Sequence, residues 1–342
     1  MGLKRKERKM ERRKRYPILV SILFLFVLIG APSLSMAAYS GEGQQALILK
    51  SGNEGSSRDL TSQAAARFAE RMKQRTNGKI QITHYPEGQL GKWQQMLESV
   101  KTGSMAILYN PPLSKTYYMF DLPYLFRDVN HVTKVMNGEI MEEFSKKELE
   151  KTGIYVFGWS YMGFRQCTFG KVPVRTPAEM KGMKFRSPPH PIMVEIFKAM
   201  GARPTPTPFG ELYLALRQGV VDGADGTIDI LTQINLWEVQ KYLVLTGHSF
   251  IANHAHLSGK IWESLTPETR KVWMDTWNEV SEEIKKETLG KEQEQISLWK
   301  SKGVTVIEPD VEAFREATKD VWKGFLTEPG QIEIYERIKA VR

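Results

Sequence analysis

The sequence of 342 residues contains a single cysteine, Cys167, so the chain cannot form an internal disulfide. It also lacks an HExxH zinc motif, a GxSxG nucleophile elbow and a phosphate-binding P-loop. Long apolar runs are scarce, and the extended one lies near the N-terminus. A chain of this length can bury a core large enough to fold without disulfides. The composition therefore indicates a globular protein, and nothing in it argues for an enzyme.

Metal-binding patterns are weak. His254 and His256 lie two residues apart on an expected strand, so both side chains face the same side and could share a metal ion. No third ligand is nearby, and an ordinary half-buried strand is the better explanation of the pair. Cys167 has no partner cysteine, and we expect it to be buried and inert. We therefore expect no metal and no cofactor.

The N-terminus has the three-part layout of a secretory signal. Residues 4–15 hold nine Lys and Arg against two Glu, an apolar run follows at 18–29, and Ser35-Met36-Ala37 supplies small residues. We expect residues 1–37 to be a signal peptide that is removed on export to the periplasm. The alternative is an uncleaved anchor, but a run of about 12 residues is shorter than the roughly 20 that span a bilayer. No cysteine lies at the junction, which excludes a lipid anchor there.

Loss of the leader changes the charge of the protein. The whole chain carries +9, of which nine basic and two acidic residues of the leader contribute +7, leaving about +2 on the mature chain. This small excess is no evidence for a nucleic-acid partner. The 305 residues that remain after removal of 37 are enough for two lobes.

The mature chain alternates strand-like and helix-like segments. Strands are expected at 46–50, 79–85 and 106–109, with helices at 59–76 and 93–101 between them. This β-α-β-α-β order predicts a parallel, doubly wound sheet and an α/β fold. Further along, strands are expected at 154–159 and 164–167 on either side of Gly163, and the longest helical pattern begins at Thr266-Pro267 and reaches about residue 302.

Arg186 follows a short apolar strand at 183–185. Pro188, Pro189 and Pro191 prevent this strand from continuing, and helices are expected at 192–200 and 209–218. Arg186 therefore lies at the mouth of a β–α unit, where open α/β sheets place their ligands. A guanidinium there suits a carboxylate, because it offers two parallel charge-assisted hydrogen bonds. The alternative is an ion pair with a neighbouring Asp or Glu.

Five motifs carry a resemblance to a known family. They are GQLG (88–91), FDLPYLF (120–126), GFR (163–165), RTPAEMKGMKFR (175–186) and MGA with PTPFGELYLALRQGVVDGADG (200–226). Together they resemble the periplasmic solute-binding subunits of tripartite ATP-independent periplasmic (TRAP) transporters, the DctP-type family. The resemblance implies a two-lobe periplasmic-binding-protein fold (type II-like) with a hinge and a long helix spanning the lobes. It places lobe I at 38–162 and 252–291, and lobe II at 163–251 and 292–342.

The resemblance also assigns ligand-binding residues. Arg186 matches the arginine that grips the substrate carboxylate, and Arg165 matches a second arginine of the cleft. Phe209 matches the aromatic residue that packs on the ligand. The turn Asp225-Gly226 matches a segment where many relatives place an Asn, and Gly226 would leave room for a larger ligand. The remaining expected contacts come from the first lobe and the hinge: Asn53, Glu54, Asn110, Trp159 and Tyr161.

These observations predict an extracytoplasmic carrier without enzyme activity. It would capture an organic acid between its lobes and deliver it to a membrane permease that an ion gradient drives. A receptor that passes the ligand signal to a sensor kinase would share the fold and the site, and a periplasmic enzyme on the same scaffold is a third reading. Dicarboxylates, keto acids, sugar acids and aromatic acids all present a carboxylate, so the ligand itself stays open.

Overall fold

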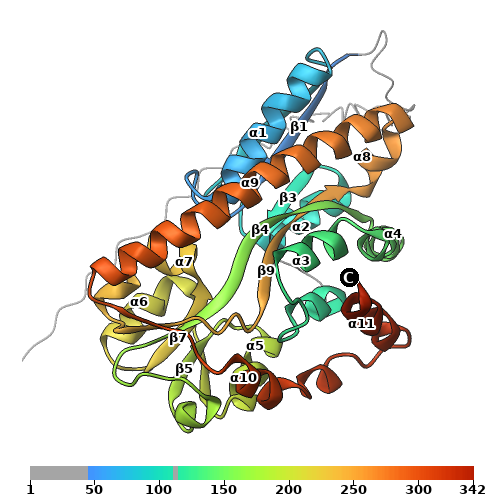
Figure 1. The fold of residues 1–342 in the computed structure, drawn as a ribbon. Helices are drawn as coiled ribbons and strands as arrows, with labels where there is room; N and C mark the ends of the chain where they lie inside the picture. Colours follow the sequence, from blue (N-terminus) through green and yellow to red (C-terminus); the bar gives the residue numbers. More distant parts are fainter. Residues whose placement is uncertain (1–44, 111–114) are drawn as a thin grey trace, which may run out of the picture. The chain divides into compact units, whose positions relative to one another are not determined.

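The computed structural model describes residues 45–110 and 115–342, and the expected signal peptide lies outside these residues. The described residues form one connected mixed sheet with helices on its faces (Figure 1). The strands are β1 (Leu47–Gly52), β2 (Ile80–Tyr85), β3 (Ile107–Asn110), β4 (Ile154–Phe169), β5 (Lys184–Ser187), β6 (Arg203–Pro206), β7 (Gly223–Thr227), β8 (Tyr242–Val244), β9 (Phe250–Ser258) and β10 (Thr305–Ile307).

Helices connect most of these strands. They are α1 (Leu60–Arg75), α2 (Trp93–Thr102), α3 (Val129–Met136), α4 (Glu139–Thr152), α5 (Pro191–Ala199), α6 (Leu212–Arg217), α7 (Ile228–Gln233), α8 (Gly259–Ser264), α9 (Pro267–Ser301), α10 (Val311–Thr318) and α11 (Gln331–Ala340). Short 3₁₀ turns are η1 (Lys115–Asp121), η2 (Pro177–Met180), η3 (Phe209–Glu211), η4 (Leu236–Glu238) and η5 (Val321–Gly324).

The first group of strands is β2-β1-β3-β9 together with the first part of β4. Strands β1, β2 and β3 are parallel, as predicted, whereas β9 runs antiparallel to both β3 and β4. A core of aromatic side chains covers one face of this group. Phe68 of α1 packs edge-on against Trp273 and Trp277 of α9, with ring centroids 5.1 and 5.5 Å apart. Such contacts fix α1 and α9 to the same face of the sheet.

Strand β4 joins the first group to the second. The sequence predicts two strands separated at Gly163, but the structure has one strand of 16 residues. Its first part pairs with β9 and its last five residues, Arg165–Phe169, pair with β7. The register with β9 shifts between Tyr161 and Gly163, and Gly163 has φ +112°, which glycine adopts without strain. A bulge, not a strand break, therefore explains this glycine.

The second group contains two strands that the sequence analysis missed. The segment expected to turn at Asp225-Gly226 is the buried strand β7, which lies between β4 and β5. Its Gly223 packs so closely that an added Cβ would lie 2.5 Å from the carbonyl oxygen of Thr168. Strand β6 contains two prolines, which argue against a strand, but it is an edge strand and so can lack two amide donors.

Most of the predicted helices are present, and they begin close to the predicted residues. Asp59 caps α1 by accepting a hydrogen bond from the backbone N–H of Ser62, and Thr266 caps α9 in the same way ahead of Pro267. The helix expected at 209–218 is in fact η3 followed by α6.

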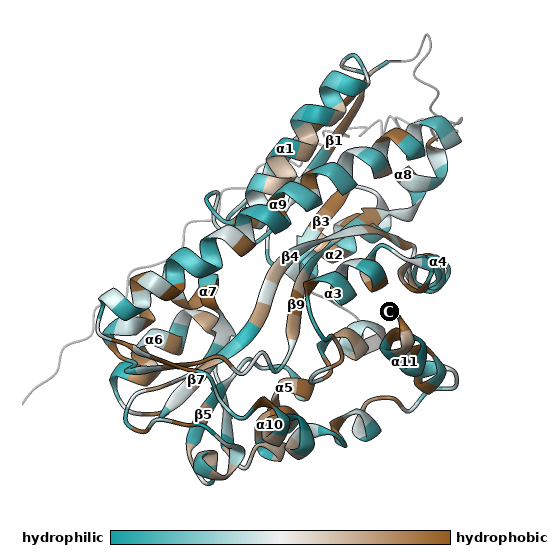
Figure 2. Cartoon of the chain, in the orientation of Figure 1, coloured by the Kyte–Doolittle hydropathy of each residue, from teal (hydrophilic) through white to brown (hydrophobic). Residues whose placement is uncertain are grey.

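Helix α9 is shared by both groups of strands. It has 35 residues and packs against α1 and β4 near its start and middle and against α7 near its end (Figure 1). Figure 2 shows its exposed side as mainly hydrophilic. Its buried residues include Trp273, Trp277, Val280 and Ile284 in the first part and Trp299 near its end. Within the described residues, no helix combines the length and the apolar character that a membrane crossing needs.

The C-terminal segment returns to the first group of strands. Arg127 donates a hydrogen bond to the carbonyl oxygen of Lys339 at 2.9 Å, and His131 lies 2.8 Å from that of Ile338. On α11 itself, both guanidine nitrogens of Arg337 bind the carboxylate of Glu143 on α4. The chain therefore ends as a strap across α3 and α4.

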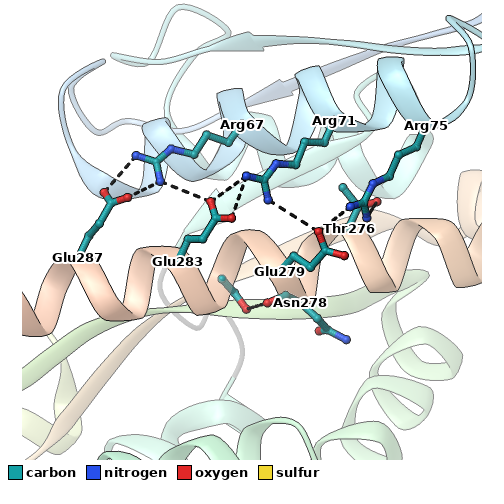
Figure 3. Close-up of polar contacts among 9 residues, drawn as sticks. Arg67, Arg71, Arg75, Thr276, Asn278, Glu279, Glu283 and Glu287 are labelled. Carbon is teal, nitrogen blue, oxygen red and sulfur yellow. Dashed lines mark hydrogen bonds and ion pairs between the residues drawn. The ribbon is translucent and has the colours of Figure 1, made fainter.

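An array of ion pairs joins α1 to α9 (Figure 3). Arg67, Arg71 and Arg75 are spaced four residues apart, and so are their partners Glu287, Glu283 and Glu279. Spacing of four places each set on one stripe of its helix. Arg71 donates two hydrogen bonds to Glu283, at 2.8 and 2.9 Å. Because each pair is partly exposed, single pairs contribute little, but the network adds to the aromatic contacts beneath it.

The middle pair of this array offers a test. Arg71→Ala should lower the free energy of unfolding by about 1 kcal/mol, because Arg71 contacts both Glu283 and Glu279. The loss should shrink at high salt, which screens exposed charges. Urea unfolding at 0.05 M and 1 M NaCl measures both effects. Lys73→Ala, an exposed change on the same helix, is the control. Equal losses in the two variants would contradict the role of the array.

Candidate functional site

A cavity of about 420 Å³ lies between the two groups of strands. The loop before α1 and the end of β3 form one wall, and Phe209, the end of β7 and α7 form the other. The middle of β4, β9 and α9 close it from behind. Its lining residues are Asn53, Glu54, Gly55, Ser56, Asp59, Leu60, Thr61, Tyr109, Asn110, Ser160, Tyr161, Met162, Phe209, Thr227, Asp229, Ile230, Gln233, Asn253 and Ile284.

Half of the expected ligand-binding residues line this cavity: Asn53, Glu54, Asn110, Tyr161 and Phe209. Asn53 is buried and donates a hydrogen bond to the hydroxyl of Ser62, while Glu54 accepts one from the backbone N–H of Trp93. Phe209 leaves 48% of its surface exposed, although it is large and apolar. An exposed aromatic residue at a cavity wall is suited to pack against a ligand.

Acidic side chains give the cavity its electrostatic character. Glu54, Asp59 and Asp229 line it, and the lining residues include no Lys, Arg or His. Burial is the main cause of a raised pKa at Asp59, and the negative charge of Asp229 raises it further. Asp229 is held by two amides, because Gln233 and Gln295 each donate to one of its oxygens at 2.7 Å.

Two of the other expected residues, Arg165 and Asp225, form a buried cluster with His248. The Nε of Arg165 on β4 donates to Oδ2 of Asp225 on β7, and Nε2 of His248 lies 3.5 Å from the same oxygen. Burial disfavours the charged form of Arg165, but the Asp225 carboxylate outweighs it and leaves the pKa of the guanidinium raised. Burial likewise works against ionisation of Asp225, yet Arg165 holds its pKa below the usual range. Arg165 thus already has an anionic partner within the protein.

Arg186 has no such partner. It is 3% exposed, and its Nε donates to the carbonyl oxygen of Thr207 at 3.0 Å. Among the described residues, no carboxylate forms an ion pair with it. Burial lowers its pKa to about 10, and neighbouring Arg165 lowers it further while Asp225 opposes the shift. A buried guanidinium without a paired anion is costly, so its environment favours the binding of one.

The arginines are close to the cavity wall without lining it. Arg165 pairs in register with Thr227 of β7, and Thr227 lines the cavity. Arg186 is bound to the carbonyl of Thr207, two residues before Phe209, which lines the cavity as well. The two guanidinium groups therefore lie behind the wall that the second group of strands contributes.

Two residues that were expected to contact the ligand, Gly226 and Trp159, pack against other parts of the protein. The space that a side chain at Gly226 would take is filled, because an added Cβ would lie 2.8 Å from Cδ2 of Leu231. Trp159 does not line the cavity; it is buried in the core beside Phe250, and its Nε1 donates to Asn137 at 2.7 Å. Neither position supplies open room for a ligand.

The histidine pair and the cysteine are buried. The rings of His254 and His256 stack with centroids 6.0 Å apart, and burial lowers the pKa of both. Within the described residues, no group of three His, Cys, Asp or Glu side chains is placed to hold a metal ion. Burial also raises the pKa of the Cys167 thiol, whose Sγ lies 3.6 Å from the Thr246 hydroxyl.

Sequence reasoning missed several cavity residues. Asp59 was interpreted only as the start of a helix and Tyr109 only as part of a strand, and Ser160, Asp229 and Asn253 were not singled out as site residues. They are brought together by pairing of distant strands, β3 with β9 and β9 with β4. His248 was missed in the same way. The available signal in the sequence was a polar residue within an otherwise mostly apolar strand, such as Asn253, because such a residue often lines a site.

Comparison with known proteins identifies the family. Residues 51–328 match the model of bacterial extracellular solute-binding proteins, family 7 (DctP). The chain belongs to this family. The family resemblance stated from the motifs is therefore confirmed, and so is the two-lobe fold with a long connecting helix, which solved TRAP solute-binding proteins share.

Individual relatives span most of the chain. It is 31% identical over 288 residues to the 2,3-diketo-L-gulonate-binding periplasmic protein YiaO of Escherichia coli, covering 82% of this chain and 88% of YiaO. A solved TRAP periplasmic solute-binding protein from Polaromonas, bound to D-erythronate, is 30% identical with a TM-score of 0.76, covering 86% and 99%. Another, from Xanthobacter autotrophicus with bound β-D-galacturonate, is 26% identical with a TM-score of 0.77, covering 86% and 100%.

A half-buried acid on α9, Glu292, predicts a pH effect on this DctP-family protein. Burial, and then the charge of Asp229, raises the pKa of Glu292 to about 7 from an ordinary 4.5. Ionised Glu292 therefore destabilises the fold above pH 7, and this penalty fades as the pH falls through 7 toward 4.5. Glu292→Gln should raise the free energy of unfolding by about 1–3 kcal/mol at pH 8 and by less at pH 5.

Urea unfolding at pH 5, 6.5 and 8 checks this prediction. Glu294→Gln, an exposed change on the same helix, is the control and should have little effect at any of these pH values. A gain that is independent of pH would show that Glu292 is not the titrating group.

Proposed function

We propose that this protein is the periplasmic solute-binding subunit of a TRAP transporter, which captures an organic acid between its two lobes and delivers it to a membrane permease. The single observation that carries the ligand class is the buried, unpaired guanidinium of Arg186. A carboxylate would give this cation the two parallel hydrogen bonds and the ion pair that the described residues do not supply.

The known relatives support an acid as the ligand. The relatives reported above are named for or hold 2,3-diketo-L-gulonate, D-erythronate and β-D-galacturonate. In this chain Arg186 would hold the carboxylate, Arg165 would assist it, and Phe209 would pack against the body of the ligand. Asn53, Glu54, Asn110 and Tyr161 would contact the rest. The protein would perform no bond chemistry.

Export and delivery follow from the same assignment. The leader at 1–37 would direct the chain to the periplasm, where the mature protein would act without an anchor. A carrier of this kind is useful to a permease only if the ligand-bound shape differs from the empty one. Binding of an anion between lobes favours the closed arrangement, and the permease would recognise that arrangement.

The lobe boundaries are part of this proposal. We infer that 38–162 with 252–291 form lobe I and that 163–251 with 292–342 form lobe II. The division agrees with the change of strand partner along β4, from β9 to β7 at Arg165. The strap at the C-terminus would then pass from lobe II back to α3 and α4 of lobe I.

Substitution of Arg186 tests the function. Arg186→Ala should keep the fold, measured by circular dichroism, and weaken binding of the physiological acid by about 2–4 kcal/mol, the scale for stranding one partner of a buried charge pair. Arg186→Lys should also bind poorly, because one ammonium cannot form the fork-shaped contact. Lys184→Ala, an exposed change on the same strand, is the control and should leave affinity unchanged.

Native mass spectrometry of freshly purified protein would identify the acid to use, and calorimetry would measure its affinity. Loss of the bound ligand on denaturation should reveal an organic acid. Unaltered affinity in Arg186→Ala would refute the role of this residue, and a bound ligand without an acidic group would refute the ligand class.

A further inference from the structure

The cavity lining and the arginines behind its wall differ sharply in charge. Two buried guanidinium groups lie behind the wall that Phe209 and β7 form, one of them paired with Asp225. The cavity lining, by contrast, holds three carboxylates, those of Glu54, Asp59 and Asp229, and no cationic side chain among the described residues. Behind the lining, Glu292 adds a fourth acid whose pKa is influenced by Asp229. Carboxylates accept hydrogen bonds and repel anions. The arginine end of the site therefore favours an anion, whereas the acids of the cavity lining disfavour one.

Two buried polar atoms of the cavity also lack partners. Asn253 is 8% exposed, its amide nitrogen donates to the hydroxyl of Thr61, and its Oδ1 has no hydrogen-bond partner among the described residues. Tyr109 is 1% exposed, and its hydroxyl likewise has no partner among those residues. Buried polar atoms are normally hydrogen-bonded, so unsatisfied ones at a cavity wall indicate a missing ligand group. For Asn253 that group must be a hydrogen-bond donor.

We propose that the site selects monocarboxylic acids that carry hydrogen-bond donors, hydroxyl groups foremost, along the remainder of the molecule, and that it rejects dicarboxylates. This inference rests on the proposed function, because it assumes that one carboxylate binds at Arg186. The donors of the ligand would bind Asp59, Asp229 and the Oδ1 of Asn253. A second carboxylate in the cavity would lie beside acids that have no countercharge there.

The geometry explains why these acids are fixed in place. Oδ1 of Asp59 is bound to the backbone N–H of Ser62 at 2.7 Å, which orients the carboxylate at the start of α1. Asp229 is oriented by the two glutamine amides. Each carboxylate oxygen can accept more than one hydrogen bond, so both acids retain capacity for a ligand. Rejection of a wrong ligand by like charge is an efficient source of specificity.

A panel of acids with matched carbon skeletons tests the proposal. At six carbons it comprises gluconate, glucarate, hexanoate and adipate, which combine one or two carboxylates with the presence or absence of hydroxyls. Equivalent sets are measured at four and five carbons, and ratios are taken at the length that binds most tightly. Calorimetry should show the hydroxylated monoacid binding at least 20-fold more tightly than its diacid and than its hydroxyl-free counterpart.

Substitution then assigns the effect to residues. Asp59→Asn removes the charge but keeps a side chain that caps helices equally well, so the fold should be preserved. It should reduce the monoacid-to-diacid ratio at least fivefold, chiefly by tightening diacid binding. Asp229→Asn should act in the same direction and provides a second test. Asp275→Asn, on an exposed part of α9 outside the cavity, should leave the ratio unchanged.

The outcomes separate the two proposals. Binding of acids with no preference against diacids, equal binding of hexanoate and gluconate, or a ratio unaffected by both substitutions overturns the present inference and leaves the proposed function standing. Failure of every acid to bind at millimolar concentration overturns the proposed function and this inference with it.

Discussion

The site depends on one imbalance of charge within a buried cluster. Two guanidinium groups and one carboxylate lie close together, and Asp225 directly pairs with Arg165 alone. Among the described residues, Arg186 forms no ion pair, so its charge has no direct partner. A second acid, Asp121, also interacts electrostatically with Arg165, and burial raises the pKa of its carboxyl to about 7. Retaining an unpaired charge in a protein interior costs stability, and a ligand carboxylate bound beside Arg186, as we propose, would offset that cost. His248, which lies beside Asp225 and Thr246, helps to hold the cluster in position.

Local signals in the sequence predicted much of the fold. The caps at Asp59 and Thr266 marked two helices correctly, and the alternation of strands and helices predicted the parallel β2-β1-β3 arrangement. The failures have a physical cause. Strand β7, GADGT, begins with Gly223 because Phe185, Phe169 and the carbonyl oxygen of Thr168 leave no room for a side chain there. Propensity is a poor guide where tertiary packing selects the residue.

The candidate site was predicted unevenly for a similar reason. Residues in recognisable motifs, such as Phe209 and Tyr161, were identified and do line the cavity. The arginines were expected to bind the ligand, which stays a prediction, and their different environments were not foreseen, because the partner of Arg165 lies 60 positions away in the sequence. The acids of the cavity were missed because Asp59 and Asp229 approach each other only in the fold. Charge balance across a cleft is a property of three-dimensional proximity.

The unbroken strand β4 has a consequence for movement. The backbone of β4 runs from one lobe into the other and is hydrogen-bonded to neighbouring strands along its length. At this crossing the lobes are therefore joined by a strand of the sheet and not by a flexible linker. Opening of the lobes must therefore twist the backbone of β4. We expect this twist near Gly163, where the register with β9 shifts and the strand pairing is interrupted. The same place contacts Glu292 of α9. We therefore expect the lobes to move by twisting of β4 about Gly163, with α9 limiting the directions in which they can move.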